Sequence, residues 1–145
     1  MTKLLILSDS HSNRLALEHI LKTEADHIDA LIFLGDGLRD LEQTLTLYPR
    51  LRAYAVAGNC DFGALEPLDG LAAFDGVVVF YTHGHMYGVK YDLDTLADAA
   101  AARGAGVLRQ PRTVKSLQPE KAPVPTCSTL RGNVMVCRPL QFSNT

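Results

Sequence analysis

Three apolar segments in the first 61 residues alternate with segments that have helical periodicity. The apolar segments cover residues 3–8, 30–36 and 51–61, and each of them stops at polar side chains. In the intervening segments, apolar side chains recur every three or four residues, as on one face of an amphipathic helix. Ser12 or Asn13 can cap the first of these helices. Buried strands that alternate with helices predict an α/β fold with a parallel sheet and helical crossovers.

The following segments predict a hairpin and a third helix. Asp75 and Gly76 separate two apolar runs within residues 71–85, and this pair is typical of a two-residue hairpin turn. An alanine-rich helix is expected from about residue 92 or 94 to residue 103. Gly104 follows at the C-cap, where glycine adopts the left-handed conformation at little cost.

Composition narrows the class of protein. The 145 residues are enough for one domain with a hydrophobic core. Hydrophobic residues make up 47% of the chain and charged residues 21%, and no run approaches the roughly 20 apolar residues of a membrane helix. The three cysteines, Cys60, Cys127 and Cys137, lack a CxxC spacing, which argues against a disulfide framework. We expect a soluble, cytoplasmic protein with free thiols and no membrane partner.

Charge and proline content change near residue 106. Residues 1–106 hold 8 basic and 15 acidic residues, whereas residues 107–145 hold 6 and 1. The second part also contains five of the seven prolines and none of the five histidines. We therefore expect a folded core at 1–106, followed at 107–145 by a divergent, basic, proline-rich tail that is disordered or comes from a shifted reading frame.

Potential metal ligands follow the predicted strands. They are, in chain order, Asp9 and His11, then Asp36, then Asn59, then His83 with His85. Taken singly, each group is explained at least as well as a turn, a helix cap or an exposed loop. However, the carboxyl ends of strands in an open α/β sheet face one crevice, so ligands from separate segments can meet there. Four such groups in order favour a shared metal site over four coincidences.

The motifs DSH, GD, GNCD and THGH at these positions resemble those of the calcineurin-like metallophosphoesterase superfamily. They are most similar to its small prokaryotic phosphodiesterase branch, which also resembles a retromer subunit of the same fold. The resemblance covers about residues 1–106. It implies a four-layer αββα sandwich, with two sheets between flanking helices, and a site for two metal ions.

The resemblance also implies a role for each ligand. Asp9 and His11 would bind the first metal, Asp36 would bridge both, and Asn59 and His83 would bind the second. Manganese suits this carboxylate-rich set best, with iron, zinc or nickel as alternatives. The two cations would activate a water that attacks the phosphate ester without a protein nucleophile.

Three further residues have less definite roles. Cys60 stands where many family members have a histidine that protonates the leaving group, but a packed thiol is the favoured interpretation. Asp61 is expected to orient its loop or a ligand rather than to bind metal. His85 would contact substrate phosphate or hydrogen-bond to a metal ligand without binding metal itself. It is a weaker candidate for the site than His83.

One family motif is missing. A further strand should end on GHTH, whose histidines bind one metal each, but residues 106–108 lead into RQPRT and no histidine follows His85. A shifted reading frame explains this best. A natural replacement, giving a metal-poor scaffold, and substitution by Cys127 or Cys137 are the alternatives.

The predicted function is metal-dependent hydrolysis of a phosphate ester, with a small phosphodiester as the favoured substrate. The alternative is a catalytically inactive member of the family that acts as a protein-interaction module. We do not expect a nucleic-acid partner, because the basic tail has only one aromatic residue, Phe142, for stacking. A homo-oligomer is a further expectation, since an incomplete second sheet would leave an open edge.

Overall fold

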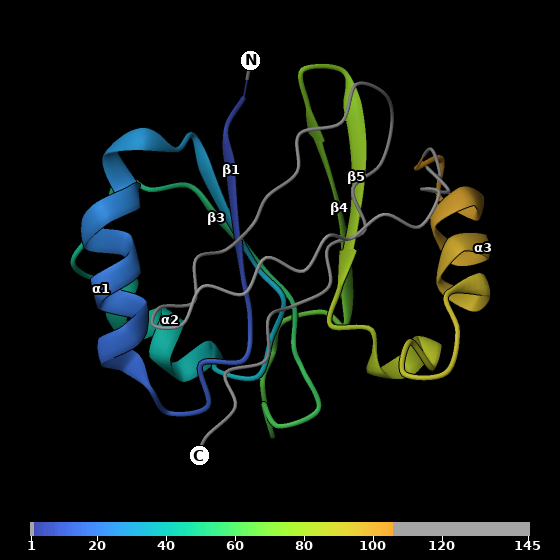
Figure 1. The fold of residues 1–145 in the computed structure, drawn as a ribbon, viewed down its shortest axis with the longest axis horizontal. Helices are drawn as coiled ribbons and strands as arrows, with labels where there is room; N and C mark the ends of the chain where they lie inside the picture. Colours follow the sequence, from blue (N-terminus) through green and yellow to red (C-terminus); the bar gives the residue numbers. More distant parts are fainter. Residues whose placement is uncertain (1, 106–145) are drawn as a thin grey trace, which may run out of the picture.

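The computed structural model describes residues 2–105, which form three α-helices, five β-strands and two short 3₁₀ helices (Figure 1). In chain order they are β1 (Leu4–Leu7), α1 (Arg14–Glu24), η1 (Ala25–His27), β2 (Ala30–Phe33), α2 (Leu38–Leu45), β3 (Ala53–Ala55), β4 (Asp69–Phe74), β5 (Val77–Thr82), η2 (His85–Tyr87) and α3 (Asp94–Ala102).

The strands form two separate sheets. Strands β1, β2 and β3 are parallel, with β2 in the middle, and β4 pairs with β5 as an antiparallel hairpin. The turn between β4 and β5 consists of Asp75 and Gly76, whose φ values of 50° and 79° are those of a type I′ turn. The predicted parallel sheet with helical crossovers and the predicted hairpin are both confirmed.

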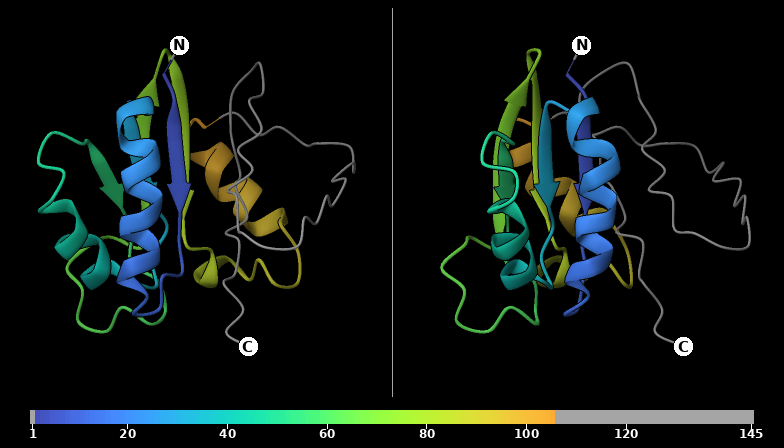
Figure 2. Two further views of the ribbon diagram at one scale, coloured as in Figure 1. Left: turned by 60° about the vertical axis from the view of Figure 1, so that its left-hand side comes forward. Right: turned by 90° about the vertical axis from the view of Figure 1, so that its left-hand side faces the viewer.

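The four layers are separated by three apolar clusters. Helices α1 and α2 cover one face of the parallel sheet, β4 and β5 lie against its other face, and α3 covers the outer side of the hairpin (Figures 1 and 2). The first cluster joins α1 and α2 to the parallel sheet and includes Leu21 and Phe33. The second lies between the sheets around Ile32 and Val56, and the third joins Phe80 of β5 to α3. The predicted αββα sandwich is therefore confirmed within the described residues.

Local capping agrees with the sequence pattern. The Asn13 side chain accepts a hydrogen bond from the Ala16 amide at 3.2 Å and caps α1, while Gly104 adopts a φ of 76° after α3. Strand β3 is shorter than its apolar segment. Beyond Ala55 the Val56 amide still donates to Phe33 of β2, and the Ala57 amide donates to the carbonyl of Pro67. The chain thus leaves the parallel sheet just before the GNCD motif.

Residues 107–145 lie outside the described residues. The predictions that fall there concern the missing strand, the reading-frame shift and metal ligation by Cys127 or Cys137. Among residues 2–105, no helix has the length and apolar character needed to cross a membrane.

Candidate metal centre

The structure brings the five predicted metal ligands together at the carboxyl ends of the strands. Asp9 and His11 follow β1, and Asp36 follows β2. Asn59 follows β3 and His83 follows β5, so the hairpin contributes one side chain to a site that is otherwise built on the parallel sheet. The side chains therefore come from both sheets and meet at their shared edge.

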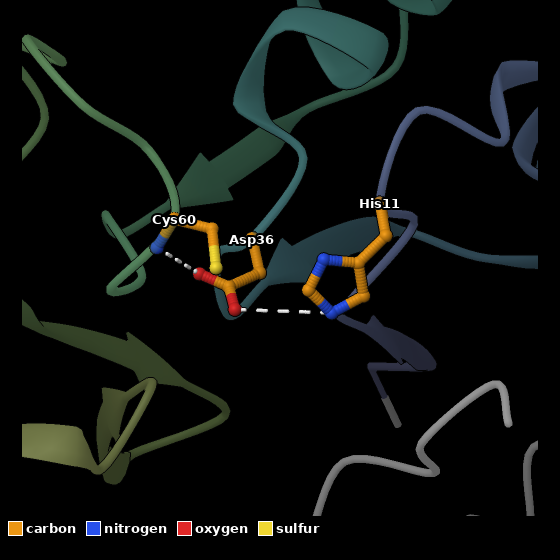
Figure 3. Close-up of side chains that lie close together, drawn as sticks. All are labelled: His11, Asp36 and Cys60. Atoms are coloured by element: carbon orange, nitrogen blue, oxygen red, sulfur yellow. Dashed lines mark hydrogen bonds and ion pairs between the residues drawn. The ribbon is translucent and has the colours of Figure 1, made fainter. Parts of the chain in front are cut away.

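Asp36 lies at the centre of the group. Its Oδ2 atom is 3.8 Å from Nε2 of His11 and 3.5 Å from Nε2 of His83, so one carboxylate oxygen lies near two imidazoles. Its Oδ1 atom accepts a hydrogen bond from the Cys60 amide at 2.7 Å (Figure 3). Only 4% of Asp36 is exposed. Asp36 is therefore the buried carboxylate that both imidazoles approach.

Two three-residue groups share Asp36. Oxygen and nitrogen atoms of Asp9, Asp36 and His83 lie within 4.8 Å of one another, and so do ligand atoms of His11, Asp36 and Cys60. Asp9 also approaches His11, with 3.4 Å between Oδ1 and Nε2. The described residues thus form two overlapping groups of candidate metal donors that share Asp36.

The backbone fixes the orientation of His83. Its Nδ1 atom lies 2.7 Å from the carbonyl oxygen of Leu34, an acceptor that requires a proton on Nδ1. In the neutral ring, Nε2 then carries a lone pair, and it faces Oδ1 of Asn59 at 3.1 Å as well as Asp36. Nε2 is therefore the ring atom of His83 that is available to a metal ion.

The loops that carry the ligands have unusual backbone conformations. Asp9, His11 and Asp36 have φ values of 58°, 44° and 58°. Such left-handed conformations cost on the order of 1–3 kcal/mol each in residues other than glycine, although aspartate and histidine tolerate them better than most. Hydrogen bonds from the Asp9 amide to Gly35 and from the His11 amide to Asp36 hold the first two loops together. The ligands are therefore held in place by backbone geometry as well as by side-chain contacts.

Two glycines allow the loops after β2 and β3 to approach each other. A Cβ atom on Gly35 would lie 2.3 Å from the amide nitrogen of Gly58. A Cβ atom on Gly58 would lie 2.1 Å from Oδ1 of Asp36. Any side chain at either position would separate Asp36 from the GNCD loop.

Asp61 holds the Asp36 loop from a distance in the sequence. Its Oδ2 atom accepts hydrogen bonds from the amides of Asp36 and Gly58 at 2.6 and 2.9 Å. Its Oδ1 atom accepts from Gly37 and Leu38 at 2.9 and 3.0 Å, at the start of α2. Partial burial alone would raise the pKa of Asp61, but the four amides together lower it.

Cys60 and His85 lie beside the ligands. The prediction that Cys60 is a packed thiol is wrong, because its side chain is exposed at the site and not in the core. A hydrogen bond to Asp36, desolvation and the charges of Asp36, Asp61 and Asp9 raise the pKa of this thiol. The His85 ring lies 5.4 Å from the His83 ring, and burial followed by the neighbouring charge of His83 lowers the pKa of His85.

The electrostatics of the site fit a bound cation. Asp9 and Asp36 are 5% and 4% exposed, and every ion pair found for them within residues 2–105 is with a histidine. Buried carboxylates without a lysine or arginine partner are costly unless a metal ion or a protonated imidazole neutralises them. The mixture of carboxylate, amide and imidazole donors suits a divalent transition metal.

Sequence reasoning missed the groups that support the ligands. One is the Leu34 carbonyl, which gave no signal because any residue supplies a carbonyl. The other is the Ser8 hydroxyl, which donates to Asp9 and gave no signal because serine is common in turns. The pairing of Gly35 with Gly58 could have been suspected, since each precedes a polar residue at a strand end.

Comparison with known proteins agrees with this geometry. Residues 2–109 match the family described as the calcineurin-like phosphoesterase superfamily domain. The chain is 36% identical over 105 residues to the probable metallophosphoesterase YsnB of Bacillus subtilis (strain 168). The aligned region covers 72% of this chain and 59% of that protein.

Solved structures show the same fold. A predicted phosphoesterase from Streptococcus pneumoniae has a TM-score of 0.60 at 24% identity, covering 71% of this chain and 57% of that chain. The phosphoesterase Yfce from E. coli has a TM-score of 0.51 at 25% identity, covering 61% and 60%. Vps29 of Chaetomium thermophilum has a TM-score of 0.56 at 17% identity, covering 72% and 55%. This chain spans less than two thirds of the length of each of these relatives, and it belongs to the calcineurin-like phosphoesterase superfamily.

Proposed function

We propose that this chain hydrolyses a small phosphodiester with the help of two divalent cations, with manganese as the preferred metal. The observation that carries the proposal is the pair of buried carboxylates, Asp9 and Asp36, whose ion-pair partners within residues 2–105 are histidines alone. Family membership supports a phosphate ester as the substrate.

Each residue has a role in this proposal. Asp9 and His11 hold the first cation, Asn59 and His83 hold the second, and Asp36 contacts both. The central position of Asp36 Oδ2 between the two imidazoles supports its bridging role. The excess of carboxylate and amide oxygen over nitrogen donors supports manganese.

The bound cations would supply a water of lowered pKa and polarise the phosphoryl oxygens. The protein's contribution is placement. Asp36 reduces the repulsion between two positive charges, and the hydrogen bond to Leu34 aims Nε2 of His83 into the site. Asp61 keeps the Asp36 loop in register with the GNCD loop. His85, next to His83, is placed to contact a phosphate oxygen.

A protein-interaction role without catalysis is the second candidate. It is favoured by one observation, the absence of histidine from residues 86–145, where the two histidines of the GHTH motif are expected. In that case the fold would be retained while metal binding and turnover are lost.

Hydrolysis of bis(p-nitrophenyl) phosphate by the whole chain with added Mn²⁺ tests the proposal, and p-nitrophenyl phosphate serves as the monoester comparison. We expect faster turnover of the diester and loss of turnover with a chelator. Absence of turnover together with absence of bound metal would leave only the interaction role.

Substitution separates the bridging residue from its neighbour. We expect Asp36→Ala to abolish binding of both ions, because Asp36 contacts both, whereas His85→Ala should weaken metal affinity by no more than about 10 to 100-fold. Equilibrium dialysis with Mn²⁺ measures both variants, and equal losses would contradict the assigned roles.

A further inference from the structure

Cys60 lies beside two of the proposed metal ligands, although neither the motif pattern nor the proposed function uses its sulfur. Figure 3 shows the Cys60, Asp36 and His11 side chains, which come from the loops after β3, β2 and β1. The cysteine Sγ, a carboxylate oxygen of Asp36 and a ring nitrogen of His11 all lie within 4.8 Å of one another. These three atoms are different kinds of metal donor on three separate segments.

The spacing of these atoms is close to that of a zinc site. Donor atoms bound to one zinc ion lie about 2.0–2.3 Å from it and therefore on the order of 3–4 Å from one another. Cys60 and His11 are both exposed, so small side-chain rotations can close the set without moving the core. Asp36, the buried member, needs no movement because the other two already face it.

Hydrogen bonds with two of the proposed metal ligands, Asp36 and Asn59, hold Cys60 in this position. The Cys60 amide donates to Oδ1 of Asp36 at 2.7 Å, which fixes the cysteine backbone against the central carboxylate. The Asn59 side chain donates to Sγ at 3.2 Å. Within residues 2–105 Cys60 is the only cysteine, and its sulfur is held toward the cluster instead of being packed among apolar side chains.

We infer that Cys60 is a metal ligand, and that Cys60, His11 and Asp36 together bind one divalent cation through sulfur, nitrogen and oxygen. The inference rests on the proposed function and adds to it. The thiol proton leaves to solvent when the metal binds, as for other cysteine ligands. Because thiolate ligands favour zinc over manganese, we infer that Cys60 shifts the first cation position, which includes Asp9 and His11, toward zinc. The second position, with Asn59 and His83, keeps its preference for manganese.

Cobalt substitution tests the sulfur ligand directly, because Co²⁺ bound to thiolate has a charge-transfer band in the near ultraviolet. We expect this band in the whole chain and in the double variant Cys127→Ser/Cys137→Ser, which lacks the other two thiols. In Cys60→Ser the band should disappear and cobalt affinity should fall by about tenfold or more. Bound cobalt without the band, or a band that survives in Cys60→Ser, would overturn the inference.

Alkylation of the unmodified chain avoids dependence on a variant that fails to fold. We expect Zn²⁺ to slow iodoacetamide labelling of Cys60 by about tenfold or more relative to Cys127 and Cys137, as read by mass spectrometry, and Mn²⁺ to protect it less. Equal effects on all three cysteines would overturn the inference.

The outcomes distinguish this inference from the proposed function. Cobalt or zinc binding without sulfur ligation removes Cys60 as a ligand and leaves the two-metal proposal intact. Failure to bind any divalent metal removes both.

Discussion

Replacement of Asp61 by asparagine should destabilise the fold through the backbone amides that the carboxylate collects. Each carboxylate oxygen accepts two amides, and together they join the loop after β2, the start of α2 and the loop after β3. Asparagine has nearly the same shape but only one acceptor oxygen, and its NH₂ group would face amides that also need an acceptor. Two of the four hydrogen bonds are therefore lost.

The expected magnitude follows from those two bonds. A hydrogen bond to a charged group contributes about 1.5–3 kcal/mol, and the lower end applies here because Asp61 is only partly buried. We expect Asp61→Asn to lower the free energy of unfolding by about 3 kcal/mol. Asp98→Asn on the exposed side of α3 is the matched control, and we expect it to change stability by less than about 0.5 kcal/mol.

The stabilisation that Asp61 provides should depend on pH. The folded protein lowers the pKa of Asp61 below its ordinary value of 3.8, so the carboxylate's contribution is complete above that value. It is lost as pH falls through the lower, folded-state pKa. The stability difference between the native chain and Asp61→Asn should therefore be constant near neutral pH and shrink below about pH 4.

Urea denaturation followed by far-ultraviolet circular dichroism measures the effect at several pH values. A loss no larger than that of Asp98→Asn would refute the view that Asp61 holds the two loops together. A loss of the expected size that persists unchanged at low pH would show that the charge of Asp61 is not its source.

Three further predictions concern the close approach of the loops, the metal and the extent of the core. Gly58→Ala should lower the free energy of unfolding by about 2–4 kcal/mol, because the new Cβ atom would overlap Asp36. Gly63→Ala is the control: its Cβ atom would have no neighbour within 4 Å, and its positive φ should cost only about 1 kcal/mol. Urea denaturation measures both variants. Mn²⁺ at 100 times its dissociation constant should stabilise the chain by about 2.7 kcal/mol, and an unchanged urea midpoint would count against metal binding to the native state. If the core ends near residue 106, limited proteolysis should trim the chain after about residue 108, whereas early cleavage inside the core would contradict that boundary.

Local signals were sufficient to predict most of the fold. The Asp75 and Gly76 turn, the Asn13 cap and the end of α3 before Gly104 each depend on residues adjacent in the sequence. The parallel sheet followed from alternating strands and helices. The order of the layers followed from the family resemblance, because apolar periodicity alone does not say which face of a sheet a hairpin covers.

The site was harder to predict because its supporting contacts are distant in the sequence. Asp61 lies 25 residues from Asp36, and His83 lies 49 residues from the Leu34 carbonyl that orients it. The exposure of Cys60 was missed for a related reason. Cysteine is usually buried, but the Cys60 amide donates to Asp36, a contact between residues 24 positions apart that the local sequence does not reveal.

The site therefore depends on features that oppose folding. Asp9 and Asp36 are buried negative charges, and with His11 they adopt left-handed backbone conformations. The apolar clusters on either side of the parallel sheet are buried well enough to tolerate these costs at one edge. Because the ligands stand at the ends of strands rather than on long loops, the fold can hold them close together before a cation arrives. If the site binds a cation as proposed, neutralising these buried carboxylates would stabilise the native state, which is the physical reason to expect folding and metal binding to be linked in this chain.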